Sequence, residues 1–197
     1  VKGASKGEGL GNSFLSNIRE MNALAHVVRC FEDNNITHVD GEINSTRDAE
    51  VINLELIFAD LETLNRRKEK IEKKLRSWVK DLANEFSLVE DCIKTLESGN
   101  FINMSDYPNK EDLLIIQSFQ LLTTKPIFFI ANVSDTESSR ENLNDLWEYA
   151  KKMNQEIIEV QIKLEEEIAS LDEQDKKDFL EFEGIEEPAL NKIIKKG

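Results

Sequence analysis

The segment PIFFIANVSD, residues 126–135, contains the strongest strand pattern in the chain, an apolar run that follows a proline. Aromatic and β-branched residues in such a run favour a β-strand. Asn132, Val133, Ser134 and Asp135 come directly after it. Ligands of parallel α/β proteins bind beyond the carboxyl ends of the strands, so we expect a candidate site at these four residues.

Two interpretations of residues 132–135 are open at this point. An amide and a carboxylate can hydrogen-bond the edge of a nucleotide base. The same residues are typical of a strand-to-helix turn with Asp135 as the helix cap, and on the residues alone we favour the turn.

Two further segments predict strands. Residues 23–31, ALAHVVRCF, are apolar and partly β-branched, and residues 156–162, EIIEVQI, lie after the central segment. Residues 32–48 predict a loop or a short extended excursion. Helices or helical turns are expected at 14–21, 143–153, 164–171, 173–182 and 188–194.

The middle of the chain has helical spacing instead. Apolar residues recur at intervals of three and four, with Lys68 as the one polar member: Leu54, Ile57, Leu61, Leu64, Ile71 and Leu75. A second series follows: Leu82, Phe86, Val89, Ile93 and Leu96. The two predict an antiparallel coiled-coil hairpin that reverses between Trp78 and Asn84 and stops at Ser98–Gly99–Asn100. Such a seam is more often a structural core than a partner-binding surface.

One more helix is expected at 110–122, after which the strand pattern resumes. The order predicts an α/β fold that is mostly helical, with a helical insertion. We expect residues 1–46 and 123–197 to form the α/β part, and residues 47–122 the inserted helical domain.

Composition limits the classes of partner. The formal net charge is −14, which opposes broad phosphate-backbone binding unless the 25 Lys and Arg cluster on one face, so direct DNA binding is not expected. No apolar run is long enough for a membrane span, and no signal-peptide pattern leads the chain. Cys30 and Cys92 lack metal-ligand spacing and predict buried thiols of a reducing, cytoplasmic compartment.

Metal and triad chemistry have little support in the sequence. His26 and His38 are the two histidines, twelve residues apart and without a nearby ligand set, so no metal site is proposed from them. No Ser-His-Asp or Cys-His set is recognisable. Trp78 and Trp147 are interpreted as hairpin-tip or core aromatic residues.

The opening VKGASKGEGLGN, residues 1–12, is rich in glycine. Its members Gly3, Gly7, Gly9 and Gly11, with Ser5 and Lys6 between them, form a loop that could change conformation at low steric cost and approach phosphates. A flexible terminus explains the glycines equally well. No part of the chain matches the P-loop pattern G-x-x-x-x-G-K-[ST].

Taken in order, these segments resemble the YchF subfamily of Obg-related P-loop nucleotidases, the Obg-like ATPases. Residues 1–12 resemble the stretch after the family's D-x-x-G motif, and residues 26–44 its next strand and loop. EVIN at 50–53 resembles the start of its inserted coiled coil. FIANVSD at 129–135 resembles its base-recognition motif, and residues 184–197 the end of its nucleotide-binding domain.

The resemblance implies a cytosolic protein that binds and hydrolyses ATP, and less well GTP, with Mg²⁺, and that associates with the ribosome. It implies that residues 2–12 are the switch II loop, whose catalytic role is unknown. It assigns base contacts to Asn132, Val133, Ser134, Asp135, Ile162 and Lys163. The P-loop, the main Mg²⁺ ligands and the family's TGS domain are then expected outside this chain.

Two positions depart from the family pattern. The family usually has N-x-x-E, whereas Asp135 supplies a shorter acid that could accept hydrogen bonds from guanine. The second base loop usually has small residues, whereas this chain has Gln161, Ile162 and Lys163, which could crowd the base.

We therefore expect the 197 residues to bind nucleotide weakly and not to hydrolyse it. The alternative hypothesis is a non-catalytic interaction module, in which the helical hairpin binds a partner and the α/β part is a scaffold.

Overall fold

The computed structural model describes residues 11–32, 43–75, 82–185 and 187–196. Packing divides the chain into two compact units, one formed by residues 1–22 and 50–126 and the other by residues 23–49 and 127–197. The domain limits expected from the sequence stay predictions. None of the helices in the described ranges combines the length and the apolar run that crossing a bilayer requires.

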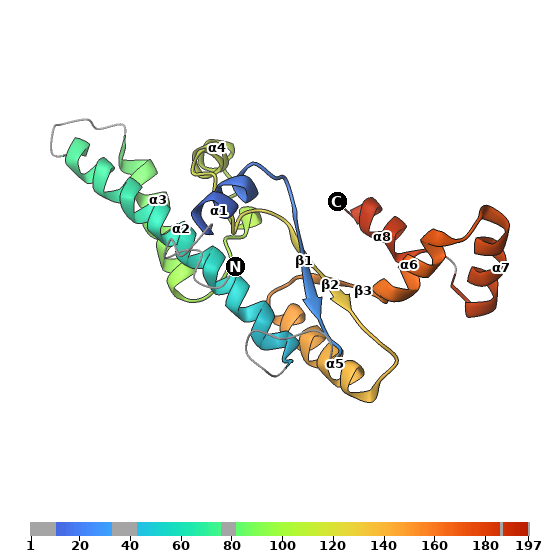
Figure 1. Cartoon of the computed structure of the whole chain (residues 1–197). Helices are drawn as coiled ribbons and strands as arrows, with labels where there is room; N and C mark the ends of the chain where they lie inside the picture. The colour runs from blue at the N-terminus through green and yellow to red at the C-terminus, as the bar shows by residue number, and fades with distance from the viewer. Residues whose placement is uncertain (1–10, 33–42, 76–81, 186, 197) are drawn as a thin grey trace. The chain divides into compact units, whose positions relative to one another are not determined.

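The second unit contains a parallel sheet, shown in Figure 1. Its strands are β1 (Leu24–Arg29), β2 (Ile127–Asn132) and β3 (Glu156–Val160), in the order β1-β2-β3. Ala25 pairs with Phe128 on one side of β2, and Phe129 pairs with Ile157 on the other. The small parallel sheet and the high helix content confirm the predicted α/β class.

Strand β2 lies between two apolar layers, which explains its unbroken apolar sequence. Because side chains alternate along a strand, Phe129 and Ala131 pack in one cluster with Leu146 and Ala150 of α5 (Glu137–Lys152). Phe128 and Ile130 pack in another cluster with Ala189 of α8. The unit also contains α6 (Ile162–Ser170), α7 (Glu173–Glu183) and α8 (Ala189–Lys196).

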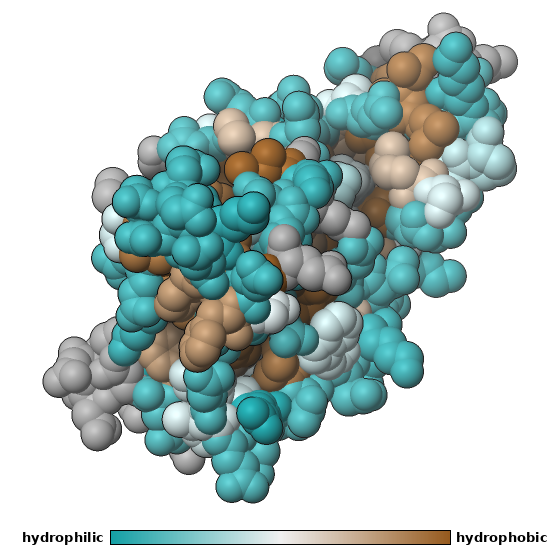
Figure 2. Space-filling model, turned by 90° about the vertical axis from the view of Figure 1, so that its right-hand side faces the viewer, coloured by the Kyte–Doolittle hydropathy of each residue, from teal (hydrophilic) through white to brown (hydrophobic). Residues whose placement is uncertain are grey.

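The first unit is helical. It holds α1 (Gly11–Arg19), most of α2 (Ser45–Leu75), α3 (Ala83–Glu97), a 3₁₀ turn η3 (Met104–Asp106) and α4 (Lys110–Ser118). Much of the face in Figure 2 is hydrophilic, in keeping with a chain that is 32% charged.

The repeating apolar positions of α2 and α3 lie in one core. Ile57, Leu64 and Ile71, spaced by seven residues, are buried, and so are Leu88, Val89, Cys92, Ile93 and Leu96 of α3. Lys68, the polar member of the series, donates to Glu90 of α3 at 2.8 Å. Leu54 is 45% exposed, so the seam does not extend to the first predicted position. The coiled-coil geometry itself stays a prediction.

The end of α3 is as the sequence predicts. Gly99 adopts a positive φ of 80°, a conformation that glycine tolerates without steric cost. Its N–H donates to the Leu96 carbonyl at 2.9 Å, which satisfies one of the last helix carbonyls.

The predicted helix at 110–122 is four residues too long. Helix α4 ends at Ser118, and Gln120 takes a φ of +53°. The reason is Asp60 of α2, whose carboxylate accepts the N–H groups of Leu122 at 3.0 Å and Thr123 at 2.8 Å. These N–H groups therefore turn away from helical partners.

Candidate functional site

The candidate site lies where β2 ends. We call residues 132–135 the first loop and residues 161–163 the second segment. Strands β2 and β3 are parallel neighbours, with Asn132 opposite Val160, so their carboxyl ends share one edge of the sheet. The N–H of Val133 extends the pairing by donating to the Val160 carbonyl at 2.9 Å. The topology therefore brings together residues that are some thirty positions apart in sequence.

Two side-chain hydrogen bonds join the first loop to the second segment. The Asn132 Oδ1 accepts the N–H of Ile162 at 3.3 Å, and the Gln161 Nε2 donates to the Asp135 Oδ1 at 3.1 Å. Ile162 is the first residue of α6, where N–H groups have no partner within the helix. Asn132 thus caps a helix that follows a different strand.

This capping explains one error in the predicted elements. The predicted strand at 156–162 ends at Val160, and Ile162 and Lys163 lie in the first turn of α6. The second segment is therefore the start of a helix, with the exposed Ile162 and Lys163 side chains at the same edge as Asn132.

The first loop is a strand-to-helix turn, but Asp135 is not its cap. The N-cap of α5 is Thr136, whose Oγ1 accepts the N–H of Ser139 at 3.3 Å. The Ser134 N–H donates in turn to the Ser139 Oγ at 2.9 Å. The exposed carboxylate of Asp135 is left to contact Gln161 and solvent.

The arrangement leaves polar groups that a ligand can use. Among the described residues, the Asn132 amide nitrogen and the second oxygen of Asp135 make no hydrogen bond. An amide donor and a carboxylate acceptor at the carboxyl edge of a parallel sheet suit a planar heterocycle with its own donors and acceptors. The Gln161 side chain lies against the Asp135 carboxylate, the group that would accept hydrogen bonds from a guanine base.

Several residues that the sequence singles out fall outside the described residues, and one of the others is exposed. Gly3, Ser5, Lys6, Gly7 and Gly9 of the glycine-rich opening are outside the described residues, and Gly11 begins α1. Trp78 and His38 are also outside them. Trp147 is not a core residue: it is 41% exposed and its Nε1 donates to Glu159 at 3.2 Å.

No magnesium step can be derived from these side chains. In the described ranges, no three His, Cys, Asp or Glu side chains are grouped so that they could hold a metal ion. His26 packs on Phe129 with ring centroids 5.3 Å apart, and burial lowers its pKa to about 4. Cys30 and Cys92 are buried, as expected, and burial raises the pKa of both thiols.

The fold and the site together define the class as a parallel α/β protein with a helical insertion and a polar site at the carboxyl edge of its sheet. No protein-family model matches the chain. Comparison with curated proteins shows 45% identity to the ribosome-binding ATPase YchF of Bacillus subtilis, over 99% of this chain and 54% of that protein. The protein of the same name from Escherichia coli O157:H7 is 42% identical over all of this chain and 54% of its own length.

A solved structure agrees with these relatives. The chain superposes on the Schizosaccharomyces pombe YchF GTPase with a TM-score of 0.81 and 28% identity, over the whole of this chain and 55% of that one. The chain therefore belongs to the YchF family, as its sequence indicates. It spans about half the length of the relatives that it matches.

Proposed function

We propose that the chain is the base-recognising part of a nucleoside triphosphatase that hydrolyses ATP or GTP. One observation carries the proposal: the Asn132–Ile162 and Asp135–Gln161 hydrogen bonds hold the two candidate base-contacting segments together at the carboxyl edge of the sheet. Relatives named ATPase and GTPase support it. The base would lie against Asn132, Val133, Ser134 and Asp135 on one side and Ile162 and Lys163 on the other.

The glycine-rich opening would act as the switch that responds to the γ-phosphate and Mg²⁺. In such enzymes, ordering of a switch loop by the phosphate and metal couples hydrolysis to a change of state. The described residues offer no ligand set for this ion. We therefore assign them recognition of the base and not phosphate chemistry.

Asn132→Ala is expected to weaken ATP binding about fivefold, because a net hydrogen bond contributes about 1 kcal/mol. The measurement is a titration of the ¹⁵N-labelled 197-residue chain with ATP, followed through the amide shifts of residues 132–135 and 161–163. Asn144→Ala, an exposed asparagine of α5, is the matched control. Asp135→Ala removes an exposed carboxylate and leaves the Asn132 cap of α6 in place. In parallel titrations with ATP and GTP, this variant should lose more affinity for GTP than for ATP. Shifts that move equally in all four proteins would contradict the proposed base site.

The chain by itself is expected to release no phosphate from ATP. It contains no P-loop pattern, and positioned amide and lysine donors supply most of the catalysis in this class. Inorganic phosphate release with saturating ATP and Mg²⁺ is the measurement. If the unaltered chain released phosphate and Asn132→Ala did not, the activity would belong to the chain and not to a contaminant. That result would overturn this expectation.

We also propose that the helical unit mediates ribosome association in the cytoplasm, through an antiparallel coiled-coil arm formed by α2 and α3. The curated relatives are named ribosome-binding. The hypothesis of a non-catalytic interaction module gains support from the same unit, because it exposes a row of cations on α2 that the base site does not use. Co-sedimentation of the chain with ribosomes, with and without excess ATP, tests the association.

A further inference from the structure

Gln161 occupies a capping position without capping its helix. It is the N-cap residue of α6, and its side chain makes no capping hydrogen bond. Glutamine is not among the residues preferred at this position, where short side chains accept from the first backbone N–H groups. The N–H of Ile162 is instead satisfied by the Asn132 side chain at 3.3 Å. Helix α6 therefore does not depend on the Gln161 side chain for its start.

The Gln161 side chain is held by the first loop of the candidate site instead. Its Nε2 donates to the Asp135 Oδ1 at 3.1 Å. This bond orients the carboxamide, because a carboxylate accepts hydrogen bonds and the amide nitrogen is the end that donates them. The protein thus occupies one of the two oxygens of Asp135 before any base is bound.

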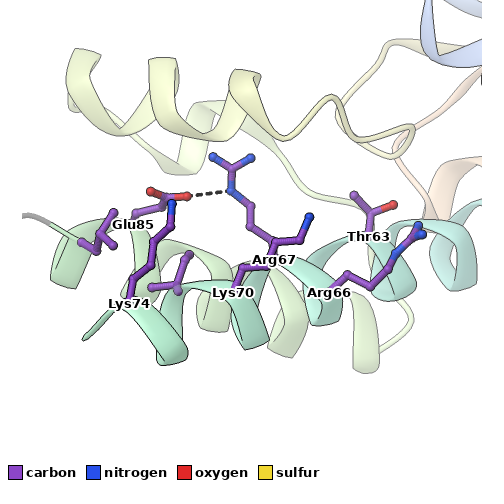
Figure 3. Close-up of a pocket in the computed structure, with 8 residues that line it drawn as sticks. Thr63, Arg66, Arg67, Lys70, Lys74 and Glu85 are labelled. Carbon is purple, nitrogen blue, oxygen red and sulfur yellow. Dashed lines mark hydrogen bonds and ion pairs between the residues drawn. The ribbon is translucent and has the colours of Figure 1, made fainter. Parts of the chain in front are cut away.

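The bond between Gln161 and Asp135 is easier to displace than the pairs that stabilise the fold. Figure 3 shows such a pair in the helical unit, where Arg67 of α2 donates to Glu85 of α3 at 2.7 Å. The Arg67 guanidinium also stacks 4.5 Å from the centre of the Phe119 ring. By contrast, Gln161 contributes a neutral amide to an exposed carboxylate. A neutral hydrogen bond at the surface has a small net free energy, so a ligand can compete with it.

A free carboxylate beside a purine discriminates between guanine and adenine. The N1–H and the N2 amino group of guanine are adjacent donors, which pair with the two oxygens of one carboxylate. Adenine has an acceptor at N1, which a carboxylate repels. Guanine therefore needs both oxygens of Asp135, one of which Gln161 occupies. Adenine needs neither oxygen, so the Gln161 amide lowers the affinity for guanine alone.

We infer that Gln161 determines the nucleotide specificity of the site: by holding Asp135 it disfavours guanine nucleotides and leaves adenine nucleotides as the preferred ligands. The inference deepens the proposed function and rests on it for the position of the base. Gln161 acts through Asp135, so it is a positioning residue and not a catalytic one.

The test compares the Kd values of ATP and GTP for the 197-residue chain, from titrations of the ¹⁵N-labelled protein followed through the amide shifts of residues 132–135. Gln161→Ala should bind GTP about two- to tenfold more tightly, the range that one competing hydrogen bond supplies, and should bind ATP within twofold of the unaltered chain. Gln174→Ala is the matched control, because Gln174 of α7 donates to Asp178 at 3.0 Å in an exposed pair of the same kind. It should change neither Kd.

Two further variants separate the hydrogen bond from the size of the side chain. Gln161→Leu keeps a side chain of similar size but has no donor, so it should favour GTP as Gln161→Ala does. In the Asp135→Ala background, Gln161→Ala should leave the ratio of the two Kd values unchanged, because the group through which Gln161 acts is gone. Inosine triphosphate lacks the N2 amino group and should gain less affinity than GTP from Gln161→Ala.

Three results would overturn the inference while leaving the base site in place. The first is a Gln161→Leu variant that binds GTP no better than the unaltered chain, which would assign the discrimination to crowding. The second is an equal gain of GTP affinity with and without Asp135. The third is an equal gain for ATP and GTP in Gln161→Ala. If neither nucleotide moves the amides of residues 132–135, the proposed base site is wrong and the role of Gln161 is wrong with it.

Discussion

Asp60→Ala is expected to destabilise the helical unit by about 3–5 kcal/mol, the range for breaking a buried charge pair from one side. The Asp60 side chain has no exposed surface. Its Oδ1 accepts from Leu122 N and from Arg19 Nη1 at 3.1 Å, and its Oδ2 accepts from the N–H and the hydroxyl of Thr123, both at 2.8 Å. One carboxylate therefore connects α1, α2 and the segment after α4.

The loss of stability in Asp60→Ala arises from the hydrogen-bond donors that would lose their acceptor. Two backbone N–H groups would lose their acceptor in a buried place, and each unsatisfied group costs about 1–3 kcal/mol. The Arg19 guanidinium would keep the Gln120 carbonyl at 2.8 Å but lose its counter-charge. Burial raises the pKa of Asp60, whereas the donors of Leu122 and Thr123, and then Arg19, oppose that rise.

Urea unfolding followed by circular dichroism measures the loss, and hydrogen exchange of the Leu122 and Thr123 amides locates it. Glu62→Ala is the matched control on the same helix, because Glu62 is 56% exposed and lies 3.9 Å from Arg66. An exposed pair of this kind contributes at most about 1 kcal/mol. If Asp60→Ala and Glu62→Ala shifted the urea midpoint equally, the anchoring role of Asp60 would be disproved.

Asp60 also shows where prediction from the sequence stops. The apolar run of β2 and the positive φ at Gly99 follow from local rules, because each depends on residues within a few positions. The early end of α4 depends on a carboxylate 62 residues away from Leu122. In the sequence Asp60 sits on a helix rich in charge, and nothing local distinguishes it from an exposed acid.

Part of the candidate site is likewise predictable from the sequence, and part of it is not. Its place, at the carboxyl end of the strand 127–132, is predictable from the apolar run and the polar residues that follow. The bond from Ile162 N to Asn132 is not, since it needs two parallel strands in a known order. Trp147 is a residue for which the local rule is wrong. A large aromatic residue suggests a core position, but Trp147 is exposed and its indole N–H donates to Glu159.

Acidification from pH 7.5 to pH 5 is expected to remove about 2 kcal/mol of stability through His26 alone. Burial lowers the pKa of His26 from 6.5 to about 4, and the weaker attraction of Asp48 opposes this shift. In the described part of the chain, the His26 Nδ1 is buried without a hydrogen-bond partner. The folded state therefore holds a neutral imidazole against the Phe129 ring.

Acid lowers the stability because the unfolded state takes up the proton before the folded state does. As pH falls through 6.5, the unfolded chain protonates its histidine while the folded chain does not, so unfolding becomes more favourable. The loss grows until the pH reaches about 4, where the folded state protonates too. At pH 5, about 1.5 units below the histidine pKa of the unfolded chain, the imidazole is protonated in the unfolded state and still neutral in the folded state. This difference in proton binding lowers the free energy of unfolding by about 2 kcal/mol.

His26→Phe removes the titrating group and keeps an aromatic ring beside Phe129. Its free energy of unfolding, from urea titrations at pH 7.5 and pH 5, should fall with acid by about 2 kcal/mol less than that of the unaltered chain. His38→Phe removes the chain's other histidine and serves as the matched control. If His38→Phe, and not His26→Phe, reduced the acid loss, the buried imidazole of β1 would not be its source. The difference between the two variants isolates His26, because the carboxylates that titrate in the same range are common to both.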